Sequence, residues 1–387
     1  MDSYDVVIVG AGIVGCSAAR HLASDHDVLV LDEDQVAAGT TARASGLVSP
    51  EYDLNGHLDA AKYASDRIWD LDGTGHFSVA EGPGVSLVRS PDVETDREMV
   101  VRAREAGFDA SFHAIDEVAD RLPDAFDRSE FAAVGIYEDV GFVDPYTFAT
   151  TLQRVAEADG AEFRTGVQVE GVTTDGVGTG ADTAVSGVDT DDGHVAADHV
   201  VVAAGWRTRD LVSEHVALPV RPFRYQTATL EVGFDVSSFP VAWEHDTLLY
   251  WRRDLNGDLH VGGQPYFVDD PGSLRTQVRS SFVDALASDL PRYLPAVDSA
   301  RVVSEDTCPI GDAATPDGRP IVDAPADGRD GLVVATGMHG FGIMLAPLAG
   351  GAVRAHVTDE SAPFDTDPYR LARFDDRSTA FGSSYID

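Results

Sequence analysis

The sequence predicts a two-domain chain whose fold class is α/β plus α+β. One domain is expected to be Rossmann-like, with a buried parallel sheet, and the other to be built on an antiparallel sheet. Residues 4–31 read as strand, helix and strand in turn, the order of a βαβ unit. Residues 200–205 form a fully apolar run, which is typical of a parallel strand covered on both faces. Longer strand-like segments between residues 221 and 263 indicate the antiparallel sheet, and 387 residues suffice for both domains.

The predicted elements of the two domains are interleaved along the chain. Strands are predicted over residues 4–9, 27–31, 81–88 (a short pair around Gly-Pro-Gly), 166–188 (short strands around a turn), 200–205, 221–232, 247–253, 258–263 and 332–335. Helices are predicted over residues 13–23, 57–71, 95–106, 145–159, 274–290 and 342–357. Both domains are therefore discontinuous: the first is expected to take residues 1–80, 145–215 and 316–387, and the second residues 81–144 and 216–315.

Acidic residues dominate the charge of the chain. Asp and Glu number 66 against 28 Lys and Arg, giving a net charge of −38, and Lys62 is the single lysine. Such a surface repels nucleic-acid phosphates and anionic lipid, so no nucleic-acid partner is expected. Because the acid is spread over the whole chain, it resembles the surface of halophilic proteins, in which salt screens the repulsion between like charges. A surface for a cationic partner is the alternative.

Neither a membrane span nor a metal site is expected from the sequence. The most apolar C-terminal stretch, residues 340–353, is too short to cross a bilayer. The first ten residues read as a strand and lack the basic start of a signal peptide. Cys16 and Cys308 form no metal or disulfide pattern, and Cys16 is expected in the core. A reducing, cytoplasmic location fits these features.

The most specific local motif is GAGIVG at residues 10–15. It lies between a predicted strand and a predicted helix, which is the context that a dinucleotide-binding turn requires. Gly10 allows the tight turn, Gly12 lets the backbone approach a pyrophosphate, and Gly15 lets the helix pack closely. Asp32 ends the next strand, where its carboxylate can accept from ribose hydroxyls. The motif alone does not separate FAD from NAD.

Two further segments complete the predicted nucleotide site. The strand 200–205 runs into Trp206, and the strand 332–335 runs into a glycine-rich turn and a helix that starts at Gly342. The second arrangement points backbone N–H groups and a positive helix end toward an anion, such as the reduced flavin around N1 and O2.

These motifs together resemble the D-amino-acid oxidase-like FAD oxidoreductases, which include glycine oxidase, sarcosine oxidase and related amino acid dehydrogenases. The resemblance rests on five ordered segments that span nearly the whole chain: GAGIVG at 10–15, GTTARASG at 39–46, VVVAAGW at 200–206, TPDGRPIV at 315–322 and ATGMHGFGIMLAP at 335–347. It implies non-covalent FAD, because Cys308 lies seven residues before Thr315, whereas the cysteine that binds flavin in sarcosine oxidases lies five before.

The resemblance also implies which residues surround FAD. They are Gly10, Ala11, Gly12, Ile13, Val14, Gly15, Asp32, Glu33, Thr41, Arg43, Ala44, Ser45, Val169, Ala204, Gly205, Trp206, Gly337, Met338, His339, Gly340, Phe341, Gly342 and Ile343.

The usual carboxylate-binding residues of the family are missing from this chain. Asp312 replaces the arginine of glycine-oxidase-like members, and Met344 replaces the lysine of sarcosine-oxidase-like members. Arg43 and Arg252, with Tyr250, are the candidate substrate residues; Arg221, Arg224 and Tyr225 are further possibilities, and structural roles compete for each.

The function that the resemblance implies is oxidation of the C–N bond of an amino acid or N-alkyl amino acid, by hydride transfer to flavin N5. His260 and His339 are the candidate catalytic residues. His260 occupies the position of a lysine near flavin N5 in oxygen-using relatives, so its weaker charge favours an electron acceptor other than oxygen. Alternatives are a 2-hydroxy acid dehydrogenase with a histidine base, or a flavin-binding subunit of a larger dehydrogenase complex.

The charge of the chain predicts that its stability depends on salt. At about 1 M salt the Debye length is about 3 Å, which screens most repulsion between surface carboxylates. We expect a higher midpoint of thermal unfolding in molar KCl than in dilute buffer. Equal midpoints, measured by circular dichroism, would contradict haloadaptation.

Overall fold

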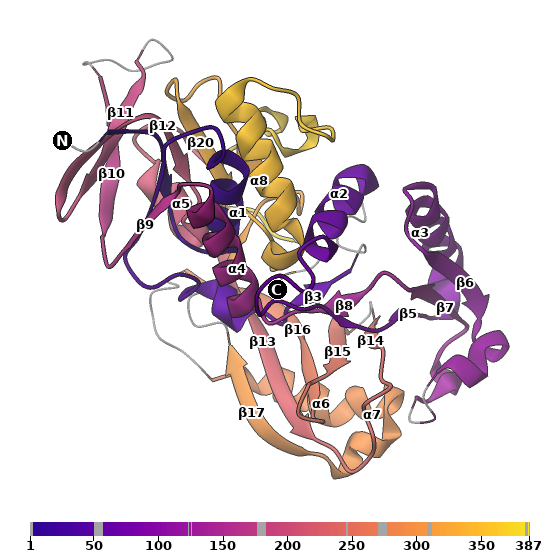
Figure 1. Ribbon diagram of the computed structural model, residues 1–387. Helices are drawn as coiled ribbons and strands as arrows, with labels where there is room; N and C mark the ends of the chain where they lie inside the picture. Colours follow the sequence, from indigo (N-terminus) through magenta and orange to yellow (C-terminus); the bar gives the residue numbers. More distant parts are fainter. Residues whose placement is uncertain are drawn as a thin grey trace.

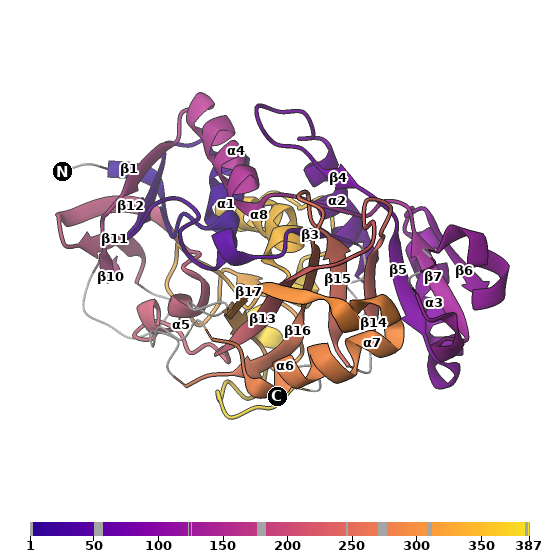
Figure 2. The same cartoon turned by 90° about the horizontal axis from the view of Figure 1, so that it is seen from below.

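The computed structural model describes residues 3–49, 57–122, 124, 126–175, 183–244, 247–269, 277–307, 312–383 and 386. Cys308, which entered the prediction of non-covalent flavin, lies outside these residues. Two large sheets form the molecule, and Figures 1 and 2 show them side by side, with helices packed against each.

The first large sheet has eight strands. Its order is β10-β11-β12-β1-β2-β9, with β20 beside β12 and β19 beside β20. The bounds are β1 Ser3–Val9, β2 Val28–Asp32, β9 Glu162–Thr165, β10 Val169–Thr174, β11 Val185–Thr190, β12 Gly193–Val202, β19 Ile321–Asp323 and β20 Leu332–Thr336. Pairing is parallel from β20 through β12, β1 and β2 to β9, and antiparallel at the additions β10, β11 and β19. The predicted parallel sheet is confirmed.

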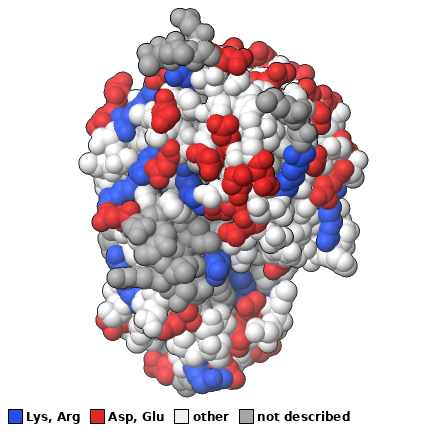
Figure 3. All heavy atoms as spheres, turned by 90° about the vertical axis from the view of Figure 1, so that its left-hand side faces the viewer, with Lys and Arg blue, Asp and Glu red and all other residues white. Residues whose placement is uncertain are grey.

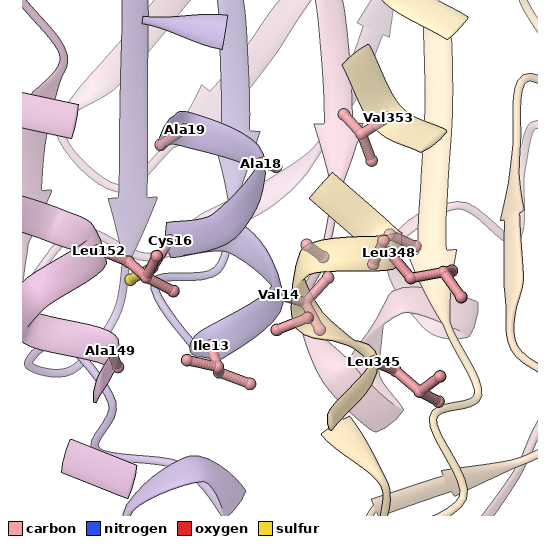
Figure 4. Packing of buried hydrophobic residues seen from close by; sticks show 14 of the residues in the cluster. Ile13, Val14, Cys16, Ala18, Ala19, Ala149, Leu152, Leu345, Leu348 and Val353 are labelled. Atoms are coloured by element: carbon pink, nitrogen blue, oxygen red, sulfur yellow. The ribbon is translucent and has the colours of Figure 1, made fainter. Parts of the chain in front are cut away.

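Helices bury one face of this sheet. They are α1 Ile13–Leu22, α2 Leu58–Trp69, α4 Pro145–Ala158 and α8 Gly342–Thr358, and their apolar residues join those of β1 and β2 in one core cluster. Figure 4 shows α1 between α4, which carries Ala149 and Leu152, and α8, which carries Leu345 and Leu348. Cys16 is fully buried there, as expected, and burial raises the pKa of its thiol. The packing fixes the N-terminal ends of α1 and α8 near one edge of the sheet.

The second large sheet has nine strands. Its order is β17-β13-β16-β15-β14-β5-β7-β6, and β18 also pairs with β13. The bounds are β5 Gly84–Val88, β6 Ala110–Ala114, β7 Ala133–Tyr137, β13 Arg221–Glu231, β14 Val241–Glu244, β15 Leu249–Arg253, β16 Leu259–Phe267, β17 Arg301–Thr307 and β18 Asp312–Ala314. All pairings are antiparallel except that of β5 with β14.

The helices described for the second unit include one that is shorter than predicted. They are α3 Val93–Glu105, α6 Ser280–Ser288 and α7 Leu290–Tyr293, and α5 Thr208–Leu211 follows β12 in the first unit. The helix predicted over 274–290 begins only at Ser280, because Arg279 has extended backbone; residues 274–276 lie outside the described part. Short 3-10 helices occur at Thr40–Arg43, Ser90–Asp92, Ile115–Arg121, Arg128–Glu130, Gly205–Arg207, Pro295–Ser299, Asp367–Tyr369 and Leu371–Arg373.

A small three-stranded sheet lies at the junction of the two units. It consists of β3 Leu47–Val48, β8 Gly141–Phe142 and β4 Ala80–Glu81. The short strand pair predicted over 81–88 is therefore divided: β4 joins this sheet, whereas β5 joins the nine-stranded one.

Acidic side chains are distributed over the surface. On the face in Figure 3, Asp and Glu gather over the middle and upper right and recur near the bottom, with Lys and Arg scattered among them. Among the described residues, no helix is long and apolar enough to cross a membrane. In the same part of the chain, no cluster of His, Cys, Asp and Glu could hold a metal ion.

Candidate cofactor and substrate site

A cavity of about 740 Å³ connects the two large sheets. At one end it is lined by the residues that follow β1, β2, β12 and β20, all at the carboxyl ends of parallel strands. Open α/β sheets bind ligands at this edge. At the other end the lining comes from β13, β14 and β15 of the nine-stranded sheet. The cavity thus joins a nucleotide-type crevice to a chamber on the antiparallel sheet.

The predicted dinucleotide turn has the required geometry. Gly10 has φ 105°, and a Cβ there would lie 2.6 Å from the carbonyl oxygen of Ala203 on the neighbouring strand. A Cβ on Gly15 would overlap the carbonyl of Gly10, so the helix could not approach the strand. Gly12 differs, because the nearest atom to its Cβ position is Thr41 Oγ1 at 3.4 Å. The protein itself therefore tolerates a side chain at Gly12, but that side chain would enter the cavity.

Asp32 supports the turn as well as lining the cavity. Its Oδ2 accepts the N–H of Ala11 at 2.6 Å, and its Oδ1 accepts the N–H of Asp34 at 2.8 Å. Burial raises the pKa of this carboxyl above its usual value. The next residue, Glu33, forms an ion pair with Arg207, and both line the same end of the cavity. Asp32 thus links β2 to the phosphate-type turn, a contact that the sequence did not indicate.

The turn between β20 and α8 differs from the sequence expectation in one respect. The N–H of His339 donates to the carbonyl of Ala313 at 3.1 Å, and that of Gly340 donates to Asp312 Oδ2 at 2.6 Å. The N–H of Phe341 donates to the carbonyl of Met338 at 2.8 Å. These three N–H groups therefore already donate to acceptors within the protein and do not point at an anion in the cavity. The positive group that faces the cavity is therefore the first turn of α8, whose N–H groups have no partner within the helix.

His339 lines the cavity, but its ring is committed to the framework. Its Nε2 accepts the backbone N–H of Thr315 at 2.7 Å, and burial lowers its pKa to about 4. Its backbone is left-handed, with φ 53°. The ring holds the strained turn against Thr315, so the structure does not support the prediction that His339 is a catalytic base.

His260 lies behind the cavity wall. Its Nε2 is 2.8 Å from Ser45 Oγ, and it is absent from the cavity lining. Burial and the neighbouring Arg252 lower its pKa to about 3. The imidazole is therefore neutral near pH 7, and the prediction that it acts directly on the substrate or as a cation is not supported.

Only one of the four candidate arginines reaches the cavity. Arg252 donates from Nε to the carbonyl of Ser45 at 3.0 Å and lies 4.5 Å from the ring centroid of Phe142, so its predicted substrate role is not supported. Arg221 lies over the ring of Phe267, and Arg224 is 1% exposed. Arg43 lines the cavity, as predicted.

Two tyrosines shape the chamber end, and neighbouring glycines make room for them. Tyr250 lies against Gly262 of the adjacent strand, where a Cβ would overlap the phenol oxygen. Tyr225 lies against Gly340 of the turn before α8, where a Cβ would overlap carbons of the tyrosine ring. Both tyrosines line the cavity, and the same end is also lined by Thr227, Trp243, Glu244, Leu248, Leu249 and Met344. A glycine opposite an aromatic residue on a neighbouring strand leaves space for the ring. Gly262 could therefore have strengthened the prediction that Tyr250 lies in the substrate site.

Most of the predicted cofactor residues line the cavity. Those that line the cavity are Gly10, Gly12, Ile13, Val14, Asp32, Glu33, Thr41, Arg43, Ala44, Ser45, Val169, Ala204, Gly205, Trp206, Gly337, Met338, His339, Gly340, Phe341, Gly342 and Ile343. Ala11 and Gly15 do not line it and act through the shape of the turn.

The parallel sheet, the glycine turn and the cavity beside it are the features of a protein that binds a dinucleotide. The chain belongs to the DAO family, whose description is FAD dependent oxidoreductase, and the match covers residues 5–355. FAD is therefore its cofactor.

Relatives agree with this family, and solved structures share the fold. The chain is 26% identical to 4-methylaminobutanoate oxidase (formaldehyde-forming) from Paenarthrobacter nicotinovorans over 95% of its own length, but spans only 45% of that protein. Glycine oxidase from Bacillus licheniformis is 25% identical, with 90% of this chain and 91% of the relative covered. The structure of L-proline dehydrogenase from P. horikoshii superposes with a TM-score of 0.86 at 19% identity, covering 96% of this chain and 98% of that one.

Substitution of Gly12 tests whether the turn holds FAD. We expect Gly12→Val to reduce FAD affinity more than 10-fold with little change in the unfolding midpoint, because its side chain meets cofactor space rather than protein. FAD content after gel filtration and thermal unfolding of the apoprotein are the measurements. Gly171→Val is the matched control, since its Cβ position is also open but lies outside the cavity. Stoichiometric FAD in Gly12→Val would contradict the assignment.

Proposed function

We propose that this chain oxidises the C–N bond of an amino acid or N-alkyl amino acid. One observation carries the proposal: a single cavity runs from the dinucleotide turn at Gly10 to a chamber of aromatic and apolar side chains on the antiparallel sheet. The names of its relatives support the substrate class, since 4-methylaminobutanoate oxidase and glycine oxidase act on amines that carry a carboxylate. Because the chain covers less than half of the first of these, its own substrate is part of the proposal.

The residues present fit FAD. The turn at Gly12 leaves open space beside the N-terminus of α1, and a second helix N-terminus, that of α8, borders the same cavity. Helix N-termini stabilise anions, which suits a pyrophosphate at one and electron-rich ring oxygens at the other. When bound, FAD accepts the hydride from the carbon next to the substrate nitrogen. We propose that it is held non-covalently.

The chamber residues have separate tasks in this reaction. Leu248, Leu249 and Met344 exclude water, and such apolar walls favour the neutral amine over the ammonium ion. Arg43 supplies a positive charge for a substrate carboxylate. Tyr250 places a hydroxyl on the wall, where it can bind the amine nitrogen.

The 2-hydroxy acid alternative finds less support. Removal of a hydroxyl proton needs a base within hydrogen-bond distance of the substrate. Nε2 of His339 is bonded to Thr315, and His260 lies behind Ser45. In both candidate bases, Nε2 is thus already hydrogen-bonded to a protein group rather than open to the substrate.

A substrate panel tests the proposed function. We expect anaerobic bleaching of the bound FAD by N-methyl amino acids or amino acids, and none by the matching 2-hydroxy acids. Arg43→Gln should raise the concentration for half-maximal reduction roughly 10-fold for carboxylated amines but not for uncharged ones. Arg221→Gln is the control, because Arg221 lies outside the cavity. Faster bleaching by a hydroxy acid would overturn the proposal, and no bleaching by any compound would favour a non-catalytic flavin-binding subunit.

We also propose that electrons leave for an acceptor other than oxygen. Oxygen reduction is helped by a fixed positive charge beside the reacting ring, and the described cations of the cavity lining are Arg43 and Arg207. Arg43 is exposed to solvent and Arg207 is paired with Glu33 at the nucleotide end, so neither is a buried positive charge.

The rate at which air reoxidises the reduced enzyme tests this second proposal. We expect reoxidation at least 10-fold slower than turnover with an artificial dye. The lowered pKa of His260, about 3, keeps it neutral from pH 5 to 9. The rate of reoxidation should therefore not rise through protonation of His260 in this pH range. Wild-type protein and His260→Ala should show the same pH dependence. Reoxidation as fast as turnover would contradict the proposal, and acceleration as the pH falls from 7 to 5, lost in His260→Ala, would show a protonated His260.

A further inference from the structure

Three side chains of the antiparallel sheet converge on Ser45, a residue of the predicted cofactor loop. Its Oγ lies 2.6 Å from the phenol oxygen of Tyr250 and 2.8 Å from Nε2 of His260. Its carbonyl accepts from Nε of Arg252 at 3.0 Å. Tyr250 and Arg252 lie on β15, and His260 lies on β16 directly opposite Arg252. One serine is therefore bonded by three residues of the substrate-side sheet.

The backbone around Ser45 is fixed from the other side. Gly46 has φ 71°, and its carbonyl accepts the N–H of Val143 at 2.8 Å. Leu47 pairs with Phe142 in the small sheet, and the guanidinium of Arg252 lies over that same phenylalanine ring. Ser45 therefore cannot shift along the loop without breaking contacts with both units.

The hydroxyl proton of Ser45 sets the donor and acceptor roles of Tyr250 and His260. A serine hydroxyl has one proton, so Ser45 can donate to only one of its two partners. If Nε2 of His260 is unprotonated, Ser45 donates to it and its oxygen accepts from the hydroxyl of Tyr250. The phenol oxygen then offers only lone pairs to the cavity. An amine N–H is a donor and matches this arrangement, whereas a substrate carboxylate does not.

We propose that Ser45, held by His260 and Arg252, is a positioning residue that makes Tyr250 a hydrogen-bond acceptor for the substrate nitrogen. The inference rests on the proposed function and specifies how the chamber recognises its substrate. The carboxylate is then left to Arg43. In this role His260 remains neutral and never contacts the substrate, and its burial beside Arg252 favours that state.

The direction can be read in the apoprotein, without cofactor or substrate. In protein labelled with ¹⁵N-histidine, long-range ¹H–¹⁵N spectra distinguish a protonated from an unprotonated ring nitrogen, and His260→Gln assigns the signal. We expect Nε2 of His260 to be unprotonated, with a shift that changes in Ser45→Ala but only slightly in Ser45→Thr. A protonated Nε2 would overturn the proposed direction.

A double-mutant cycle tests the link to the substrate. In anaerobic single-turnover reduction, with rates compared per bound FAD, we expect Ser45→Ala to slow reduction roughly 10-fold and Ser45→Thr to restore most of the rate. In protein that already carries Tyr250→Phe, Ser45→Ala should slow reduction by a further factor of less than about two, because the two residues act as a unit. Fully additive losses would show that Ser45 acts independently of Tyr250 and would overturn the proposal.

The two proposals fail in different ways. Wild-type protein that binds FAD but is reduced by no amine would contradict the proposed function, while the histidine spectra would still decide the hydrogen-bond direction. Wild-type protein that is reduced normally, with unchanged kinetics in Ser45→Ala, would contradict the positioning role alone.

Discussion

The close approach of backbone to backbone at the edge of the parallel sheet is the constraint on which the site depends. Gly10 lies against the carbonyl of Ala203, and Gly15 lies against the carbonyl of Gly10, so β12, β1 and α1 meet with no side chain between them. Asp32 ties β2 to the same turn through the N–H of Ala11. Because these contacts remove side chains from the edge, the N-terminus of α1 opens directly on the cavity.

The second requirement is that the antiparallel sheet keeps a fixed position over this edge. Ser45 and the small sheet provide it, since they bond to residues of both units. The hydroxyl between Tyr250 and His260 is therefore both a structural joint and part of the chamber wall. A displacement of the cofactor loop would move Tyr250 as well, which couples the two binding regions through one residue.

Sequence reasoning predicted the elements that local patterns determine. The apolar run at 200–205 and the turn at 10–15 gave the parallel sheet and the nucleotide end, because strand burial and glycine spacing are local properties. The roles of His260 and His339 could not be predicted in this way. Each depends on a partner far along the chain, Ser45 for one and Thr315 for the other. Likewise, the amides of the turn after β20 resembled anion donors until Asp312 and Ala313 proved to be their acceptors.

The charge of the chain places a further demand on the site. A net charge of −38 opposes the binding of an anionic cofactor and of a substrate carboxylate. The cavity offsets this locally, with Arg43 and with the positive ends of α1 and α8, which border it. Salt screens charges that are separated by more than a Debye length, so it weakens the repulsion from distant surface acids far more than these short, partly buried interactions. High salt therefore favours binding in this chain, whereas in a protein with a basic surface it would oppose it.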